Sequence, residues 1–389
     1  MRPAPALFLS GIFLLSLLAS CKKENHGSAS PPPPRPTAPN VYVLGTEGNV
    51  ALYWKNGVPT KLDSQAVLAV GFNSSSLAVS NGHVYISGAR PNYNGSIVAG
   101  IPVYWLNGVA TTLPDSSGNA SGNAIFVAGT DVYEAGSTLY PDTSHVPYST
   151  PTADYPRDGQ RATIWKNGMP VSLPGYGVVG LVDSAKYAVR SYEDYVNSIY
   201  VSGTDVYVSG GSFWQPAHAG YWKNGVRVDL TGSLSYTASN GSSGFPNTTS
   251  LFVAGSDVYV TGYEATSLTA PVAIYWKNGA SHFLSTDSIN GSQATSVFVS
   301  GGDVYIAGWQ NINGYSRATV WKNGIATTLT SGSTSSSANA VRVSGSDVYV
   351  AGSQWVAPGH YVAVYWKNGI PVTLTDGSTN AIAFSIQIE

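Results

Sequence analysis

The chain contains 389 residues, of which only 10% are charged, and its formal net charge is −2. An average soluble domain is ~25% charged, so most polar surface must come from Ser, Thr, Asn and the backbone. The near-neutral balance provides no basic field for a phosphate backbone and argues against a nucleic-acid partner. One cysteine excludes an internal disulfide, and six scattered histidines lack metal-ligand spacing, so we expect neither a metal nor another cofactor.

Residues 1–20 are predicted to be a signal peptide. Arg2 supplies a positive n-region, and the apolar run from Ala6 to Leu18 is too short to span a bilayer as a helix. The run ends in the sequence L-A-S-C at Cys21, which resembles the lipobox of bacterial lipoproteins. The resemblance implies cleavage before Cys21 and lipidation of that residue, which would bind the protein to membrane lipid. An ordinary secretory signal with an incidental cysteine is the alternative.

Residues 21–40 are predicted to be the lipidated cysteine and a proline-rich tether. The sequence K-K-E-N after Cys21 resembles the export signals of surface lipoproteins. Pro31 to Pro34 are consecutive, and such a run is extended, at ~3.1 Å per residue as polyproline II. We therefore expect a lipid anchor in the bacterial outer membrane, facing outward, that carries residues 41–389 as the folded domain.

Residues 41–389 repeat one unit seven times, with a mean period of roughly 50 residues, which is typical of repeat architectures. One element is W-K-N-G, with one W-L-N-G variant, at Trp54, Trp105, Trp165, Trp222, Trp276, Trp321 and Trp366. Val-Tyr followed closely by Gly alternates with it, at Tyr42, Tyr85, Tyr133, Tyr207, Tyr259, Tyr305 and Tyr349.

Each unit predicts four strands, named A to D in chain order. In the sixth unit these are residues 295–300, 303–308, 318–322 and 325–329. Asn323-Gly324 between strands C and D predicts a type I′ hairpin, because both central residues of that turn need positive φ. Helical periodicity is absent throughout the units.

Four antiparallel strands with this period resemble a β-propeller blade, in a WD40- and kelch-like architecture without the signature motifs of those families. The first unit starts at strand B, and an extra strand-like run, residues 380–388, follows the last unit. We therefore expect an all-β fold, a seven-bladed β-propeller of four-stranded antiparallel blades in which the C-terminal strand completes blade 1. Such closure removes unpaired sheet edges. An open β-solenoid is the alternative.

The repeated side chains have predicted structural roles. The tryptophan of each unit is expected to pack between blades, and the lysine after it to face solvent. An Asp at the A–B turn is expected to accept local backbone N–H groups rather than to bind metal. These turn residues are Asp131, Asp205, Asp257, Asp303 and Asp347, and His83 occupies the same place in the second unit.

The variable connections indicate a binding face. The A–B and C–D turns are short in every unit, whereas the B–C and D–A connections vary widely in length. Because the strands are antiparallel, all B–C and D–A connections lie on one face of the propeller, and binding residues are often found on such loops. Residues 137–160 and 174–197 are the charged examples in units 3 and 4. The candidate ligand contacts on this face are Trp214, Tyr263, Trp309, Trp355, Tyr155, Arg157 and Asp158.

These residue types favour non-catalytic binding of an extracellular glycan or a protein partner by a monomer. Aromatic rings stack on the apolar faces of sugars, although aromatics also pin loops by packing. No catalytic residue is assigned, because no G-x-S-x-G elbow occurs. The alternatives are a repeat scaffold without a tight ligand, and a glycosidase or lyase. The enzyme would use carboxylates among Asp142, Asp154, Asp158, Glu193, Asp194 and Glu264.

Overall fold

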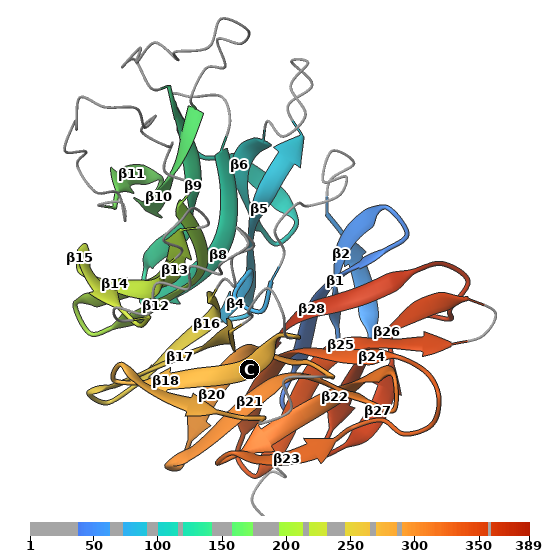
Figure 1. Ribbon diagram of the computed structural model, residues 1–389. Coiled ribbons are helices and arrows are strands. Elements are labelled where there is room, and N and C mark those ends of the chain that lie inside the picture. Colours follow the sequence, from blue (N-terminus) through green and yellow to red (C-terminus); the bar gives the residue numbers. More distant parts are fainter. Residues whose placement is uncertain are drawn as a thin grey trace, which may run out of the picture. The chain divides into compact units, whose positions relative to one another are not determined.

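A computed structural model describes residues 38–62, 73–91, 100–115, 120–141, 158–173, 194–212, 218–231, 246–264, 270–285, 290–356 and 359–389. These residues form 28 β-strands and no helix. The strands make seven four-stranded antiparallel sheets, the blades, arranged in a ring (Figure 1). Two cavities lie between the inner strands and mark the central channel of the ring. The predicted all-β, seven-bladed β-propeller is confirmed.

Each blade runs from an inner strand A, beside the channel, to an outer strand D. Blade 1 comprises β28 (Ala381–Ile388), β1 (Val41–Glu47), β2 (Val50–Lys55) and β3 (Val58–Lys61). Blade 2 comprises β4 (Leu77–Ser80), β5 (His83–Pro91), β6 (Gly100–Leu106) and β7 (Val109–Thr112). Blade 3 comprises β8 (Ala120–Ala128), β9 (Asp131–Pro141), β10 (Asp158–Lys166) and β11 (Met169–Ser172).

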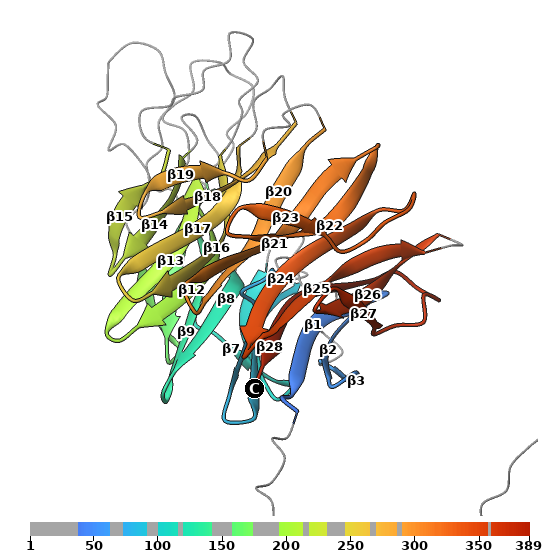
Figure 2. The same cartoon turned by 90° about the horizontal axis from the view of Figure 1, so that it is seen from below.

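The remaining blades follow in chain order around the ring, from green to red in Figure 2. Blade 4 comprises β12 (Asp194–Ser202), β13 (Asp205–Ser212), β14 (His218–Lys223) and β15 (Val226–Asp229). Blade 5 comprises β16 (Asn247–Ala254), β17 (Asp257–Glu264), β18 (Val272–Lys277) and β19 (Ala280–Phe283). Blade 6 comprises β20 (Ser292–Ser300), β21 (Asp303–Ile312), β22 (Tyr315–Lys322) and β23 (Ile325–Thr328). Blade 7 comprises β24 (Ser336–Ser344), β25 (Asp347–Val356), β26 (His360–Lys367) and β27 (Ile370–Thr373).

The C-terminal strand completes blade 1, as the sequence predicted. β28 pairs antiparallel with β1 along the whole length of β1, and the two lie side by side as the red and blue strands of Figure 1. Just beyond the strands, the N–H group of Asn40 donates to the carbonyl of Glu389 at 2.6 Å, and the N–H of Glu389 donates back at 3.0 Å. The ring is therefore closed by main-chain hydrogen bonds between its first and last strands.

All seven C–D connections are the predicted Asn-Gly turns. The backbone φ is 49–52° at each Asn and 78–86° at each Gly. Positive φ at both central residues defines a type I′ turn, whose twist matches that of the flanking strands. The Asn side chain also reaches the neighbouring A–B turn, since Asn323 Oδ1 accepts from the N–H of Val304 at 2.9 Å. The motif thus fixes two turns of one blade.

A repeated cluster of four side chains, the turn clasp, joins the A–B and C–D turns. In blade 6 it consists of Asp303, Tyr305, Lys322 and Asn323. Lys322 Nζ lies 2.8 Å from Asp303 Oδ2 and 5.3 Å from the centroid of the Tyr305 ring. Asn323 Nδ2 donates to Asp303 Oδ1 at 2.8 Å. Equivalent ion pairs occur in blades 3, 4, 5 and 7. The aspartates stand at the A–B turns as predicted, but the expected bonds from local backbone N–H groups are wrong. Their carboxylates accept from the Asn and Lys side chains of the C–D turn, and the Asn takes the backbone N–H instead. The partly exposed lysines are paired with the aspartates.

The seven tryptophans of strand C form the core between blades. Each is at most 1% exposed, and six share a cluster with side chains of the preceding blade. Trp321 of blade 6 packs with Tyr259 and Ala273 of blade 5. The strand-B glycine provides space, because a Cβ on Gly308 would lie 2.0 Å from the Gln293 carbonyl oxygen and 2.9 Å from the Trp321 ring. Interblade packing of the tryptophans is confirmed.

The observed strands differ from the predicted ones in length. In blade 6, β20 begins three residues before the predicted Thr295, and β21 continues beyond the predicted Gly308 to Ile312. β4 is the exception among inner strands, with four residues where the others have eight or nine. The residues just before β4 leave the sheet and enter the channel.

Candidate functional site

The inner strands that line the channel carry an irregularity at a shared height. In six blades the register of strand A shifts by one residue, which is a β-bulge. A bulge leaves one residue unpaired and turns its side chain away from the sheet. The six bulge residues are Asn123, Asn197, Thr249, Thr295, Asn339 and Phe384.

Polar side chains at this height connect each blade to the next. Asn123 Nδ2 donates to the Val196 carbonyl at 2.7 Å. At four further junctions a side chain donates to a main-chain carbonyl of the next blade. The amides of Asn197 and Asn339 donate to the carbonyls of Thr248 and, at 2.7 Å, Ala383. The hydroxyls of Thr249 and Thr295 donate to the carbonyls of Ala294 and Ala338, both at 2.8 Å. The other two junctions use serines, Ser385 to the Ser74 carbonyl at 2.8 Å and Ser76 to the Asn123 carbonyl at 2.7 Å. All seven junctions therefore have a side-chain-to-backbone bond.

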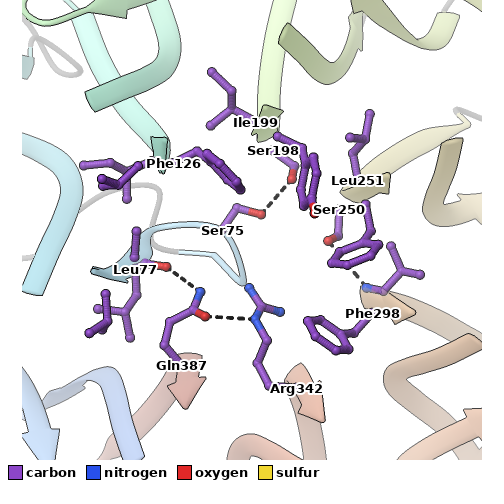
Figure 3. Close-up of a pocket in the computed structure, with 17 residues that line it drawn as sticks. Ser75, Leu77, Phe126, Ser198, Ile199, Ser250, Leu251, Phe298, Arg342 and Gln387 are labelled. Carbon is purple, nitrogen blue, oxygen red and sulfur yellow. Dashed lines mark hydrogen bonds between the residues drawn. The ribbon is translucent and has the colours of Figure 1, made fainter. Parts of the chain in front are cut away.

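Residues 73–76, the serine turn, cross the channel of the propeller. The turn is held locally, because Asn73 Oδ1 accepts from the N–H of Ser75 at 2.7 Å. Ser74 Oγ donates to the Thr295 carbonyl of blade 6 at 3.1 Å. Ser75 Oγ donates to Ser198 Oγ of blade 4 at 2.8 Å, a bond that Figure 3 shows. The serine turn separates an upper chamber, toward the B–C and D–A connections, from a lower chamber, toward the A–B turns.

The upper chamber is a neutral polar cavity of about 270 Å³. Burial raises the pKa of the Tyr195 and Tyr263 phenols, which keeps both in the neutral form. No charged side chain is among its described lining residues. They are amides, hydroxyls and aromatic rings: Asn73, Asn197, Asn247, Gln293, Asn339, Ser74, Thr249, Thr295, Tyr195, Tyr263 and Phe384.

The lower chamber is a cavity of about 320 Å³ with an aromatic wall and one cation. Phe126, Tyr200, Phe252 and Phe298 come from four consecutive inner strands, and their neighbouring ring centroids lie 4.8, 4.9 and 4.8 Å apart. Arg342 occupies the same strand position in blade 7, and Figure 3 shows its guanidinium directed into the cavity.

The structure separates the predicted ligand contacts. Tyr263 lines the upper chamber, and Trp309 reaches it indirectly, because its Nε1 donates to Gln293 Oε1 at 3.2 Å. Trp355, which is 37% exposed, packs edge-on against Tyr361 with ring centroids 5.0 Å apart and is not a lining residue of either chamber. Four other candidates lie outside the described residues: Trp214, Tyr155, Arg157 and Cys21. Asp158 is the first residue of β10, and only its backbone is described.

Of the candidate carboxylates, only Asp194 and Glu264 have described side chains. Asp194 was expected in a loop, but it begins β12, pairs with Ser212 of β13 and is fully buried. Glu264 ends β17, and partial burial raises its pKa. In the described ranges, no three His, Cys, Asp or Glu side chains are arranged to hold a metal ion. No described helix has the length and apolarity needed to cross a membrane.

Sequence reasoning missed the lower chamber, because loop length drew attention only to the opposite face. A usable signal was present in the repeats. The triplets I-F-V, I-Y-V, L-F-V and V-F-V occupy one position of strand A in blades 3 to 6, where V-R-V stands at 341–343 and I-Q-I at 386–388. Aligning the seven units would have shown that Arg342 and Gln387 replace aromatic residues.

Comparisons with known proteins identify a fold and no family. No protein-family model and no curated protein matches the chain. The structure superimposes on a puromycin-hydrolysing peptidase of Mycobacterium tuberculosis with a TM-score of 0.51 and 10% identity, over 87% of this chain and 52% of that one. At this identity the likeness shows the β-propeller fold alone.

Two further solved structures give lower scores. The acylaminoacyl peptidase of Pyrococcus horikoshii has a TM-score of 0.49 and 13% identity, over 87% of this chain and 50% of that one. The β-propeller domain of the Trilobed protease from Pyrococcus furiosus has a TM-score of 0.46 and 11% identity, with 87% and 94% of the chains covered. The chain spans about half the length of the first two peptidases it resembles.

Proposed function

We propose that this protein is a lipid-anchored, surface-exposed binding protein whose upper chamber takes one sugar residue of an extracellular glycan. The observation that carries the proposal is the neutral lining of amides, hydroxyls and aromatic rings around a cavity of about 270 Å³. Small-molecule pockets begin at roughly 300 Å³, so the chamber matches a single ring rather than a longer chain.

The chemistry of the lining suits a polyhydroxylated ring. A side-chain amide both donates and accepts hydrogen bonds, as a sugar hydroxyl does. The apolar C–H face of a sugar packs on an aromatic ring such as Tyr263 or Phe384, both of which line the chamber. An uncharged lining avoids the desolvation cost that an ion would add when a neutral ligand displaces water.

One lining amide is oriented in advance. Gln293 Oε1 accepts from Trp309 Nε1 at 3.2 Å, and this bond fixes the orientation of the amide, with its oxygen toward Trp309. The bond leaves Gln293 Nε2 as the donor for a ligand oxygen. Trp309 therefore supports the proposal as a positioning residue, whereas Tyr263 and Gln293 would contact the sugar.

The anchor is part of the same proposal. Lipidated Cys21 would hold the protein in the outer leaflet of the bacterial outer membrane, and residues 21–40 would act as a spacer. Cys21→Ser should move the protein from the membrane fraction to the soluble fraction and abolish incorporation of labelled palmitate. Retention of the variant in membranes would contradict the anchor, independently of any result on glycan binding.

The test of glycan binding is a glycan array probed with the purified full-length protein in detergent. We expect binding to one family of neutral glycans, its loss in Tyr263→Ala and Gln293→Ala, and a weaker signal in Trp309→Ala. Trp355→Ala is the matched control, because it removes an aromatic ring outside the chamber and should bind normally.

Three outcomes would contradict the proposal. They are no binding to any glycan, equal binding by Tyr263→Ala and the wild type, and loss of binding in Trp355→Ala alone. Cleavage of a bound glycan during long incubation would replace simple binding by the enzyme alternative. The candidate carboxylate for such cleavage is Glu264, which comes directly after the lining residue Tyr263 in β17. The hydrolytic activity would then have to fall in Glu264→Gln.

A further inference from the structure

The lower chamber differs from the repeat in one arc of its wall. Seven inner strands each place one residue at the height of the aromatic rings. Blades 3 to 6 supply aromatic residues, whereas blades 7, 1 and 2 supply a cation, an amide and a methyl group. The seven residues are Phe126, Tyr200, Phe252, Phe298, Arg342, Gln387 and Ala78. The cavity is therefore apolar on one side and polar on the other.

The guanidinium of Arg342 is fixed by the groups around it. Its Nε donates to Gln387 Oε1 at 3.1 Å, and its Nη1 donates to the Val341 carbonyl at 2.8 Å. Gln387 is itself anchored, because its Nε2 donates to the Leu77 carbonyl at 2.8 Å (Figure 3). The guanidinium carbon also lies 5.6 Å from the centroid of the Phe298 ring. A fixed guanidinium loses little entropy when it binds a ligand.

The positive charge of Arg342 has no compensating anion among the described residues. No described Asp or Glu lies within ion-pair distance of it, and no described side chain lining the chamber is acidic. Its hydrogen bonds to described residues come from Nε and Nη1, which leaves Nη2 available, and Figure 3 shows the guanidinium directed into the cavity. Burial lowers the pKa of Arg342 to about 10, which leaves the guanidinium charged at neutral pH. Arg342 is partly buried, and a partly buried cation without a partner has a desolvation cost that a bound anion would reduce.

The shape and polarity of the cavity restrict the anion. One guanidinium balances a single negative charge, so part of the charge of a phosphate dianion would stay uncompensated. The aromatic arc accepts a flat apolar body by stacked or edge contacts. A volume of about 320 Å³ is at the small end of ligand pockets.

We propose that the lower chamber is a second ligand site, which binds a small carboxylate with a flat apolar body. The carboxylate accepts from Arg342 Nη2, and the body packs against the arc from Phe126 to Phe298. The serine turn separates this site from the upper chamber, so it is independent of the glycan site.

The probes are benzoate, its uncharged analogue benzamide, and nitrate at the same ionic strength, each tested with the full-length protein. Calorimetric titration should show benzoate binding, and thermal melts should show a concentration-dependent rise in Tm. Benzamide and nitrate should give neither effect. Equal effects of benzoate and benzamide would overturn the role of the charge. Equal effects of benzoate and nitrate would overturn the role of the apolar body, and no benzoate binding would overturn the site.

Two variants separate binding from folding. Arg342→Met should weaken benzoate binding about tenfold or more, as expected for loss of a charge-assisted hydrogen bond. Phe126→Leu leaves Arg342 and its partners in place, and should weaken benzoate binding by shortening the aromatic arc. Unchanged benzoate affinity in both variants would overturn the proposal. Tyr263→Ala should bind benzoate normally, so failure of the glycan proposal would leave this result intact.

Discussion

The turn clasps and the channel wall are built from the same repeat, yet they differ in how strictly they follow it. In five blades the clasp brings Lys Nζ within 2.8–2.9 Å of Asp Oδ2, with the same four residue types each time. The channel wall places aromatic, cationic, amide and methyl groups at one equivalent position. The clasp side chains are uniform in these five blades, because each of them closes the same two turns. Positions that depart from the repeat, such as Arg342 in the channel wall, carry a charge or polarity that the other blades lack.

Among the positions that follow the repeat, the interblade tryptophans should have the largest effect on stability. Trp222→Ala should lower the free energy of unfolding by about 3–5 kcal/mol, because it removes a fully buried ring from the contact with blade 3. Trp276→Ala should cost a similar amount, since Trp276 has the same burial and the same kind of neighbours in blade 4.

Denaturant unfolding monitored by tryptophan fluorescence and circular dichroism measures both losses. Trp355→Ala is the control, because its side chain is 37% exposed and its loss should change stability little. A cost in Trp355→Ala as large as in Trp222→Ala would contradict the assignment of the strand-C tryptophans as the core.

Glu134 is a departure from the repeat in the core rather than in the channel. It is 1% exposed, and neither carboxyl oxygen has a hydrogen-bond partner among the described residues. Its carboxyl borders a cavity of about 180 Å³ that Trp165 also lines. The other six blades have buried Val or Ile at this position: Val43, Ile86, Val208, Val260, Ile306 and Val350. Blade 3 is therefore expected to be less stable than its neighbours.

Glu134→Val should raise the free energy of unfolding by about 1–3 kcal/mol near pH 8, the cost of an unpaired buried polar group. The gain should shrink toward pH 4. Burial raises the folded-state pKa of Glu134 well above its usual 4.5. The folded protein therefore holds this proton more tightly than the unfolded chain, and stability falls as the pH rises from 4.5 toward the folded pKa.

Denaturant titrations of both proteins at pH 4 and pH 8 measure the difference. Val208→Glu in blade 4 is the reverse variant, and it should lower stability and introduce the same pH dependence. A gain from Glu134→Val that is equal at both pH values would show that the carboxyl has a partner in solution.

The sequence predicts the fold well because its determinants are local. Asn323-Gly324 adopts the positive φ of a type I′ turn readily, and Gly308 must be small beside Trp321, so seven copies of these signals define seven blades. The channel could not be predicted in the same way. Ser75 and Ser198 are 123 residues apart and meet only when the ring closes. Asp194 was assigned to a loop because its strand extends beyond the repeated core, to pair with Ser212.

The smallest expected effect concerns the charges of the turn clasp. Asp303→Asn should change stability little at neutral pH, because the ion pair with Lys322 is exposed to solvent and exposed pairs contribute little. Blade 1 carries this change naturally, since Asn40 accepts from Asn56 Nδ2 at 2.8 Å in place of the aspartate. An Asn at position 303 should keep the bond from Asn323 and lose only the contact with the lysine.

The effect of Asp303→Asn should depend on pH in the acid range alone. Lys322 and then Asn323 hold the pKa of the Asp303 carboxyl below its usual 3.8. A lowered folded-state pKa contributes stability above the unfolded value, and this contribution is lost as the pH falls through the folded pKa. Thermal melts should therefore show wild type and variant converging as the pH falls from 3.8 through the folded-state pKa of Asp303. A concentration of 1 M NaCl should reduce their difference at pH 6, because salt screens exposed charges. A difference that persists at pH 2 would mean that the aspartate acts through its shape and hydrogen bonds rather than its charge. Replacing all five clasp aspartates by Asn would then be expected to add five equal structural losses, whereas a charge mechanism predicts that the sum disappears at low pH.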